Sequence, residues 1–298
     1  MSRGSDIADA PRDAGTVIIA VLWLLGLLGF VTAAMAVYTT NTLSAVDVYG
    51  DRARADAVIA GGVELAVWQL LTTEKPLQGS SSGTIGDARV AFDYRDETAR
   101  IDVNAAAPEL LAGLFTSLGA RDNEADAYAQ RIVEVREPSQ AEAAQAAQAG
   151  AGPPRKRFVD VAQLDQVQGL PEALIARAKP FLTVYSARAE INPRICAPEI
   201  LAALPGMTRE RVRTALALRA RNSSDHDAWA DALGEAAKFT TDDPGRSARL
   251  RVKADLRDGF TATSEIVIVR FDDDAEPYRV LAWEDDVDLY SPAGATKR

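Results

Sequence analysis

The chain has 298 residues, of which 47% are hydrophobic, so it can form one large or two ordinary domains with a buried core. Its formal net charge of -10 argues against nucleic acid as the main partner, because phosphate backbones are bound by clustered Lys and Arg. A single cysteine, Cys196, and a single histidine, His226, exclude intrachain disulfides, zinc sites made of Cys and His, and most histidine-based catalysis.

The first predicted element is an apolar helix near the N-terminus. No charged residue occurs between Ala14 and Val46, and Thr16 to Tyr38 is apolar almost throughout. At ~1.5 Å per residue this stretch can cross a bilayer core of ~30 Å. Its Leu, Ile, Val and Phe residues favour insertion by roughly 4 to 7 kcal/mol. A cleavable signal peptide has a shorter apolar region of ~7 to 15 residues, so we expect a transmembrane helix at residues 16–40.

The helical pattern continues beyond this apolar run. Residues Leu43 to Leu71 contain few helix breakers, and apolar side chains recur there at helical spacing. The recurring side chains are Ile59, Val63, Ala66, Val67 and Leu70. We therefore expect one long helix, with its first half in lipid and its second half on a head domain. Charge leaves the orientation open, because two arginines precede the span and two follow it. These are Arg3, Arg12, Arg52 and Arg54.

Alternating patterns predict strands at both ends of the head. Ala88 to Arg95 alternates, and a short polar turn leads from it to Ile101 and Val103, which predicts a hairpin. Near the C-terminus, Leu250 to Leu256 alternates up to Asp258-Gly259, a pair suited to a type I′ turn. Two further strands are expected at Phe260–Phe271 and Tyr278–Trp283. These runs predict a small antiparallel sheet.

Between the two strand regions the pattern is helical. Ala-rich and Leu-rich runs punctuated by Pro and Gly extend over roughly Ala105 to Thr240, so the sheet is expected to be split by a helical insertion. Within it, Ser139 to Arg157 is rich in Ala, Gln, Gly and Pro and is expected to be a flexible excursion.

A short repeat lies inside the insertion. Ala106 to Leu114 (AAPELLAGL) recurs as Cys196 to Leu204 (CAPEILAAL), with Pro at a first helical position and Glu in the first turn. An Asn, Asn104 or Asn192, lies upstream of each copy and is available to end the preceding extended segment. We interpret these residues as caps and core positions and not as catalytic groups.

Two segments resemble the helix-hairpin-helix motif, namely Leu164–Leu170 and Leu201–Met207. Versions that bind DNA usually carry a second Gly that lets the backbone approach phosphate, and that position is Pro171 or Thr208 here. We interpret both as structural hairpins and keep a membrane-anchored DNA-binding protein as the alternative function. An anchored hydrolase would depend on His226, which lies in a polar run typical of a solvated loop, so no enzymatic activity is expected.

Several stretches together resemble the K-type minor pseudopilin of type II secretion systems (the GspK family), a kind of type IV pilin-like protein. They are Gly15–Trp23, Ala60–Ala66, Asp102–Ala105, Ile191–Asn192, Ala197–Gly206 and Tyr278–Trp283. The resemblance implies an α+β fold in which a long N-terminal helix packs on a small antiparallel sheet and a large α-helical domain is inserted between strands. The implied divisions are a leader at 1–15, a transmembrane helix at 16–40, the first part of the head at 41–103, the inserted helical domain at 104–244, and the C-terminal strands and tail at 245–298.

The resemblance also implies how the N-terminus is processed. A prepilin peptidase would cut after Gly15, and Thr16 would become the N-methylated first residue. Ala20 is then the fifth mature residue, where most pilin-like subunits carry a Glu that pairs with the terminal ammonium of a neighbour in the low dielectric of lipid. A subunit without this Glu can receive the next subunit but cannot dock beneath another, which fits the tip of a filament used to export folded proteins across the outer membrane.

The partners that the resemblance implies are other filament subunits. They are the I-type and J-type minor pseudopilins, with the H-type and the major pseudopilin as further candidates, in the bacterial inner membrane with the head in the periplasm. The helix surface for this assembly would include Trp23, Gly26 and Gly29, since small residues permit close helix approach. No nucleic acid is expected as a partner.

No cofactor is required by this interpretation, although some family members bind calcium in the head. Acidic clusters could supply its oxygen ligands, and Asp272, Asp273 and Asp274 are the candidates, beside Asp242-Asp243 and Asp285-Asp286. None has the spacing of an EF-hand, and acidic turns are usually only solvated.

Overall fold

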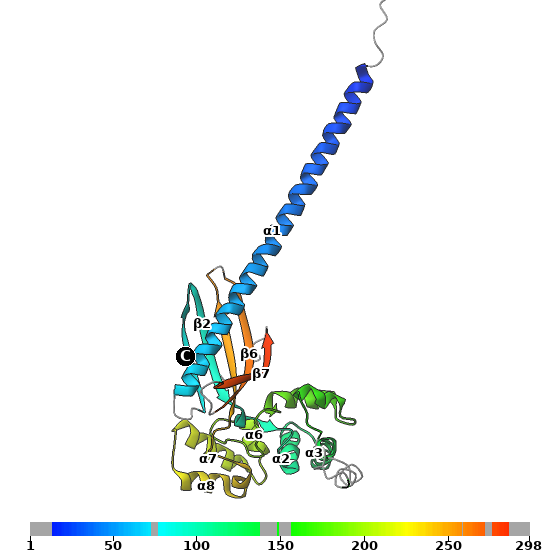
Figure 1. Ribbon diagram of the computed structural model, residues 1–298. Coiled ribbons are helices and arrows are strands. Elements are labelled where there is room, and N and C mark those ends of the chain that lie inside the picture. The colour runs from blue at the N-terminus through cyan, green and yellow to red at the C-terminus, as the bar shows by residue number, and fades with distance from the viewer. Residues whose placement is uncertain are drawn as a thin grey trace, which may run out of the picture. The chain divides into compact units, whose positions relative to one another are not determined.

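The computed structural model describes residues 14–72, 77–137, 148, 156–257, 259–271 and 276–285 (Figure 1). The chain divides into two units, residues 1–56 and residues 57–298. The predicted long helix is confirmed: α1 (Ala14–Thr72) begins in the first unit and ends in the second.

The first unit contains the apolar part of α1. Its stretch Ile18–Met35 has a mean hydropathy of 2.5 and no buried residue, so by length and composition it can cross a membrane. A second stretch, Gly50–Thr72, passes the same test with a mean hydropathy of 1.3, but 44% of it is buried. Such burial is typical of a helix that packs in the core of a folded domain.

In the second unit the end of α1 packs on a sheet. The five apolar residues predicted to form its inner face are all buried, from Ile59 to Leu70. The approach is close at Gly62, where an added Cβ would lie 2.6 Å from a methyl group of Val252 and 2.7 Å from one of Val90. Glycine is therefore needed there by the packing, which places the backbone of the helix against the sheet.

The sheet has five antiparallel strands in the order β1-β2-β5-β6-β7. The strands are β1 (Gln78–Ile85), β2 (Ala88–Asp96), β5 (Ser247–Asp255), β6 (Thr261–Arg270) and β7 (Tyr278–Asp285). Central strands β2 and β5 pair from Arg89↔Asp255 to Asp96↔Ala248, although the whole helical insertion lies between them in sequence. The α+β class with a split sheet is thus confirmed.

The predicted N-terminal hairpin has a different partner strand. β2 pairs with β1 through a turn at Gly86 (φ +61°), and not with Ile101–Val103. Sequence reasoning missed β1 because it reads QGSSSGTI and, as an edge strand that is mostly exposed, needs no alternation of apolar residues. After β2, Asp96 accepts a hydrogen bond from the backbone N–H of Thr98 (2.9 Å) and starts a turn of 3-10 helix, η1 (Glu97–Ala99). The chain then leaves the sheet.

The C-terminal strands follow the prediction. β5 and β6 form a hairpin whose turn includes Gly259 at φ +92°, while Asp258 lies outside the described residues. β7 pairs with β6 and forms an edge of the sheet, with an irregularity between Val267 and Ile268.

The inserted helices gather beyond one end of the sheet (Figure 1). They are α2 (Pro108–Ser117), α3 (Asp122–Arg136), α5 (Glu172–Ala178), α6 (Pro198–Ala203), α7 (Arg209–Ala220) and α8 (His226–Leu233), with 3-10 turns η2 (Val161–Gln166), η3 (Lys179–Phe181) and η4 (Gly234–Phe239). Two short strands, β3 (Ile101–Asp102) and β4 (Leu182–Thr183), pair with each other in parallel. Phe115, Leu110 and Ile132 are among the fully buried residues of a common apolar core.

The sequence repeat forms the starts of α2 and α6, with Pro108 and Pro198 at the first helical positions, as predicted. The two upstream Asn residues are not structural counterparts, because the residue that corresponds to Asn192 is Asp102. Each side chain accepts a hydrogen bond from the N–H two residues later, Asn104 N to Asp102 Oδ1 at 2.8 Å and Arg194 N to Asn192 Oδ1 at 3.0 Å. Asp and Asn make this turn equally well, so a match by residue type alone misaligned the copies.

The two helix-hairpin-helix look-alikes differ. The second is a true helical hairpin, in which α6 and α7 are joined through Gly206 (φ +78°) and Thr208 caps α7 by accepting from Arg211 N–H. In the first, the segment before Gly169 (φ +81°) is the 3-10 turn η2 instead of a helix. Of Ser139–Arg157, only residues 148, 156 and 157 lie within the described part of the chain.

The cysteine offers a direct probe of this fold. Cys196 is 1% exposed at the start of the second repeat copy, and burial raises the pKa of its thiol to about 12, with Arg219 nearby acting in the opposite direction. Both facts predict an inert thiol in the folded protein. We expect iodoacetamide at pH 8 to leave the native chain unlabelled and to label it fully in concentrated urea, as measured by intact mass. Rapid labelling without urea would contradict this burial.

Candidate assembly surface on the N-terminal helix

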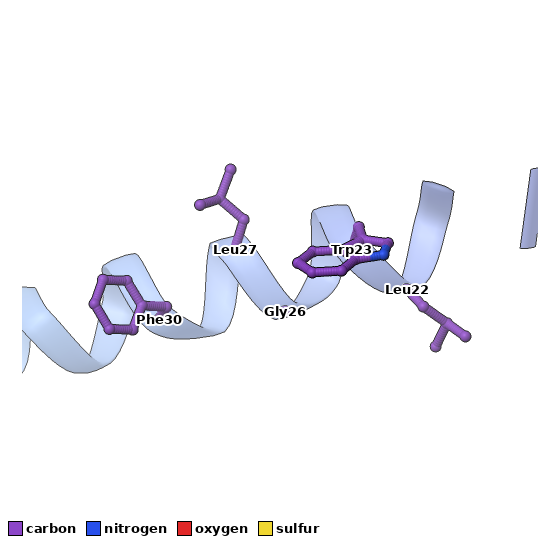
Figure 2. Close-up of a pocket in the computed structure, with 5 residues that line it drawn as sticks. All are labelled: Leu22, Trp23, Gly26, Leu27 and Phe30. Carbon is purple, nitrogen blue, oxygen red and sulfur yellow. The ribbon is translucent and has the colours of Figure 1, made fainter. Parts of the chain in front are cut away.

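The first unit presents an apolar notch on α1. The residues that line it are Leu22, Trp23, Gly26, Leu27 and Phe30, and its volume is about 410 Å³. Figure 2 shows the rings of Trp23 and Phe30 on the same side of the helix, with Gly26 between them and Leu22 and Leu27 at opposite edges. This follows from helix geometry, because positions i, i+3 and i+7 lie on one face.

The glycines leave this surface open. An added Cβ at Gly26 or Gly29 would meet nothing within 4 Å, so no contact inside the chain requires glycine at either position. The nearby hydroxyl of Thr32 donates to Leu28 O at 3.0 Å and to Gly29 O at 2.9 Å. Its polar group is satisfied within the helix, and the surface is therefore apolar and able to contact lipid or another helix.

The predicted site residues are distributed unevenly over this surface. Trp23 and Gly26 line the notch together, whereas Gly29 is not among its lining residues. Ala20 is exposed on the same helix, and the backbone at Gly15 and Thr16 is helical. Sequence reasoning missed Leu22, Leu27 and Phe30, although their spacing from Gly26 was visible in the sequence.

In the head, the charged groups concentrate where the insertion joins the sheet. Glu97 of η1 is 1% exposed, and its Oε1 accepts from Arg249 Nε at 2.7 Å. Arg249 also pairs closely with Glu265, whose other oxygen accepts from Arg251 at 3.0 Å. The hydroxyl of Thr183, in β4 of the insertion, donates to Glu97. This ion-pair network ties β4 and η1 to strands β5 and β6.

The pKa shifts in this network follow from burial opposed by charge. Burial alone would raise the pKa of Glu265, but the charge and hydrogen bonds of Arg249 outweigh it and hold that pKa below its usual value. Burial, with Arg249 nearby, lowers the pKa of Arg100 to about 10. Burial also raises the pKa of Asp102, whose Oδ2 accepts from the hydroxyl of Ser186 at 3.1 Å and from the N–H of Ala187 at 2.8 Å. Glu265 and Asp102 have hydrogen-bond partners within the fold, and the network connects the inserted helical domain to the sheet.

Within the described ranges, the other candidate residues do not lie together. His226 begins α8 with its side chain 86% exposed, and its Nδ1 lies 3.7 Å from a carboxylate oxygen of Asp242. That carboxylate is paired with Arg194 through two hydrogen bonds. Among the residues that the structure describes, no three His, Cys, Asp or Glu side chains are close enough to hold a metal ion. The calcium candidates Asp272, Asp273 and Asp274 lie outside the described residues.

The long helix with an exposed apolar N-terminal half, and a helix end packed on an antiparallel sheet, define a pilin-like protein. Residues 90–187 match the family model described as "Type II secretion system (T2SS), protein K". Over this segment, about a third of the chain, the protein is similar to protein K of the type II secretion system.

Two further comparisons were made with known proteins. No curated protein matches the chain by sequence. A solved structure of the GspK-GspI-GspJ complex from the type 2 secretion system of enterotoxigenic Escherichia coli is similar, with 18% identity, a TM-score of 0.49, and coverage of 78% of this chain and 93% of that chain. The alternative of a DNA-binding pseudopilin gains no support from either.

Proposed function

We propose that this chain is a minor pseudopilin of the type II secretion system, and that it forms the tip of the secretion filament and nucleates its assembly. The observation that carries the proposal is the uncharged helix surface from Ile18 to Met35, which has an apolar notch and Ala20 at the fifth position after Gly15. In a membrane this helix can bury its exposed surface only against lipid or other helices. Its function is therefore assembly and not chemistry, and we propose that it needs no cofactor. Calcium at the acidic turn Asp272–Asp274 stays a prediction.

The proposed position at the tip follows from electrostatics. A free ammonium at Thr16 within lipid needs a carboxylate, because an isolated charge is costly in a low dielectric. The next subunit can supply this carboxylate from below. Ala20 supplies none, so this chain has nothing to offer an ammonium above it. A subunit that can form only one of these two ammonium–carboxylate contacts, the one with the subunit below it, belongs at the end of a filament.

We further propose that its partners are the I-type and J-type minor pseudopilins, with the H-type and the major pseudopilin next in the filament, and that a prepilin peptidase processes it. In this proposal the helix lies in the inner membrane and the head in the periplasm. The notch at Gly26 would accept a large apolar side chain from a neighbouring helix. Mass spectrometry of the N-terminus from the native membrane tests the processing, since a chain that begins with methylated Thr16 supports the proposal and one that retains residues 1–15 contradicts it.

Filling the notch tests the helix contact. We expect Gly26→Leu to reduce both co-purification with the other minor pseudopilins and the amount of secreted protein about tenfold, because the added side chain prevents close helix approach and a loss of about 1.4 kcal/mol lowers affinity tenfold. The control is Leu24→Trp, which adds bulk on the opposite face, since two residues turn a helix by about 200°. Equal losses in both variants would mean that the notch is no specific contact.

A further inference from the structure

The inserted domain contains a second, separate groove. It lies between α3, the segment 156–158 and η2, with a volume of about 540 Å³. Its lining residues are Arg131, Glu134, Val135, Lys156, Arg157, Phe158, Gln163, Gln166, Val167 and Gln168. A groove of this size holds several residues of an extended peptide or a small molecule.

The apolar part of this groove is held in place by the fold. Phe158 is fixed at both backbone groups, since its N–H donates to Asn104 Oδ1 at 2.8 Å and its carbonyl accepts from Asn104 Nδ2 at 2.9 Å. Val135 on α3 also lines the groove and is 40% exposed, so it adds an accessible apolar side chain beside Phe158. Asn104 was interpreted from the sequence as a cap, but its side chain instead holds Phe158 in place at the groove.

The polar part of the groove has unused hydrogen-bonding capacity. Within the described part of the chain, the side chains of Arg157, Gln166 and Gln168 make no hydrogen bond or ion pair. Arg131 is different, because it donates to Gly169 O at 2.5 Å and lies over the ring of Tyr128. Free amide groups of Gln can pair with both the N–H and the C=O of an extended backbone.

The charge of the groove is opposite to that of the chain. Its ionisable residues are three cations, Arg131, Lys156 and Arg157, and one carboxylate, Glu134. The chain as a whole carries a formal charge of -10, so this local excess of positive charge stands out. A partner that seats a carboxylate here gains a charge-assisted hydrogen bond from Arg157, which is among the stronger contacts that a protein surface can offer.

We propose that this groove binds an extended, acidic peptide segment of another protein. An extended strand points alternate side chains to opposite sides. One set of side chains would contact Val135 and Phe158, acidic side chains would reach Arg157, and the peptide backbone would pair with Gln166 and Gln168. The proposal involves only the inserted domain and does not depend on the position of the chain in the filament.

The test uses the full chain in detergent and a short fluorescent peptide of alternating Glu and Val, with a Lys and Val peptide of the same length as comparison. Fluorescence polarisation should show binding of the acidic peptide that weakens as salt is raised, and no comparable binding of the basic one. We expect Arg157→Glu to weaken binding about tenfold or more, because it places like charges together.

The matched control is Arg213→Glu on α7, which makes the same change in net charge at a side chain that is 76% exposed and outside the groove. It should leave the affinity within about twofold, as expected for a charge outside the contact. Equal loss in both variants would overturn the proposal in favour of general charge attraction. Tighter binding of a single-stranded oligonucleotide than of the peptide would also overturn it. The absence of binding to wild type would overturn it as well.

Discussion

Replacing Arg249 by methionine is expected to destabilise the head by about 3 to 5 kcal/mol, the usual cost of removing one partner from a buried ion pair. The substitution keeps an unbranched apolar stem but removes the cation between Glu97 and Glu265. Glu97 is 1% exposed, so water cannot easily replace the lost partner. Urea unfolding of the full chain in detergent, followed by the fluorescence of buried Trp229, measures the change.

The pH dependence gives this prediction a second readout. In the wild type the pKa of Glu265 lies below its ordinary value of 4.5, so its stabilising effect is present above that pH and is lost as the pH falls through the lowered pKa. Without Arg249 the pKa of Glu265 should rise, because its burial is then opposed by fewer cations. Ionised Glu265 is therefore less favourable in the variant, and this cost disappears once the carboxyl is protonated. The difference in stability between wild type and variant should therefore be largest near neutral pH and shrink toward pH ~4.

An exposed arginine provides the control. Arg213→Met removes the same charge from a side chain that is 76% exposed, 3.9 Å from Glu210, and should change stability by no more than about 0.5 kcal/mol. If Arg249→Met were equally mild, or if its cost did not vary with pH, the network at the base of the insertion would not be what joins it to the sheet.

Regular periodicity made most of the fold predictable. The inner face of α1 from Ile59 to Leu70 and the strand β5 were visible because each buries one side at a constant spacing. β6, which is buried on both faces, and β7, which is mostly exposed, were visible as runs between turns. β1 was missed because an exposed edge strand has no buried side to impose a pattern. The parallel contact between β3 and β4 was missed as well, because two residues are too short to have a period and their pairing depends on distant contacts.

The ion-pair network between the insertion and the sheet could not be predicted from the sequence, and the reason is different. Glu97 and Arg249 are far apart in sequence, and each looks like an ordinary surface charge until the fold brings them within 2.7 Å. On the helix, Trp23 and Gly26 came from the family resemblance and do line one notch. Cleavage after Gly15 stays a prediction, because it depends on an enzyme and no contact inside the chain tests it.

A single methyl group at Gly113 is expected to cost about 3 kcal/mol, although alanine normally favours a helix over glycine by about 1 kcal/mol. An added Cβ would lie 1.9 Å from the carbonyl oxygen of Ala203, which is backbone and cannot rotate away. Helices α2 and α6, the two copies of the repeat, must therefore separate and lose packing around the core between them. Urea unfolding of Gly113→Ala measures this loss.

The comparison for this variant is Gly50→Ala, a helical glycine at which an added Cβ meets nothing within 4 Å. It should raise helix stability slightly, so the two identical substitutions are expected to have opposite signs. If Gly113→Ala proved as stable as wild type, α2 and α6 would not cross at this glycine. Helix propensity alone would make alanine stabilising at both Gly113 and Gly50. Only the close backbone contact at Gly113 makes the substitution destabilising there.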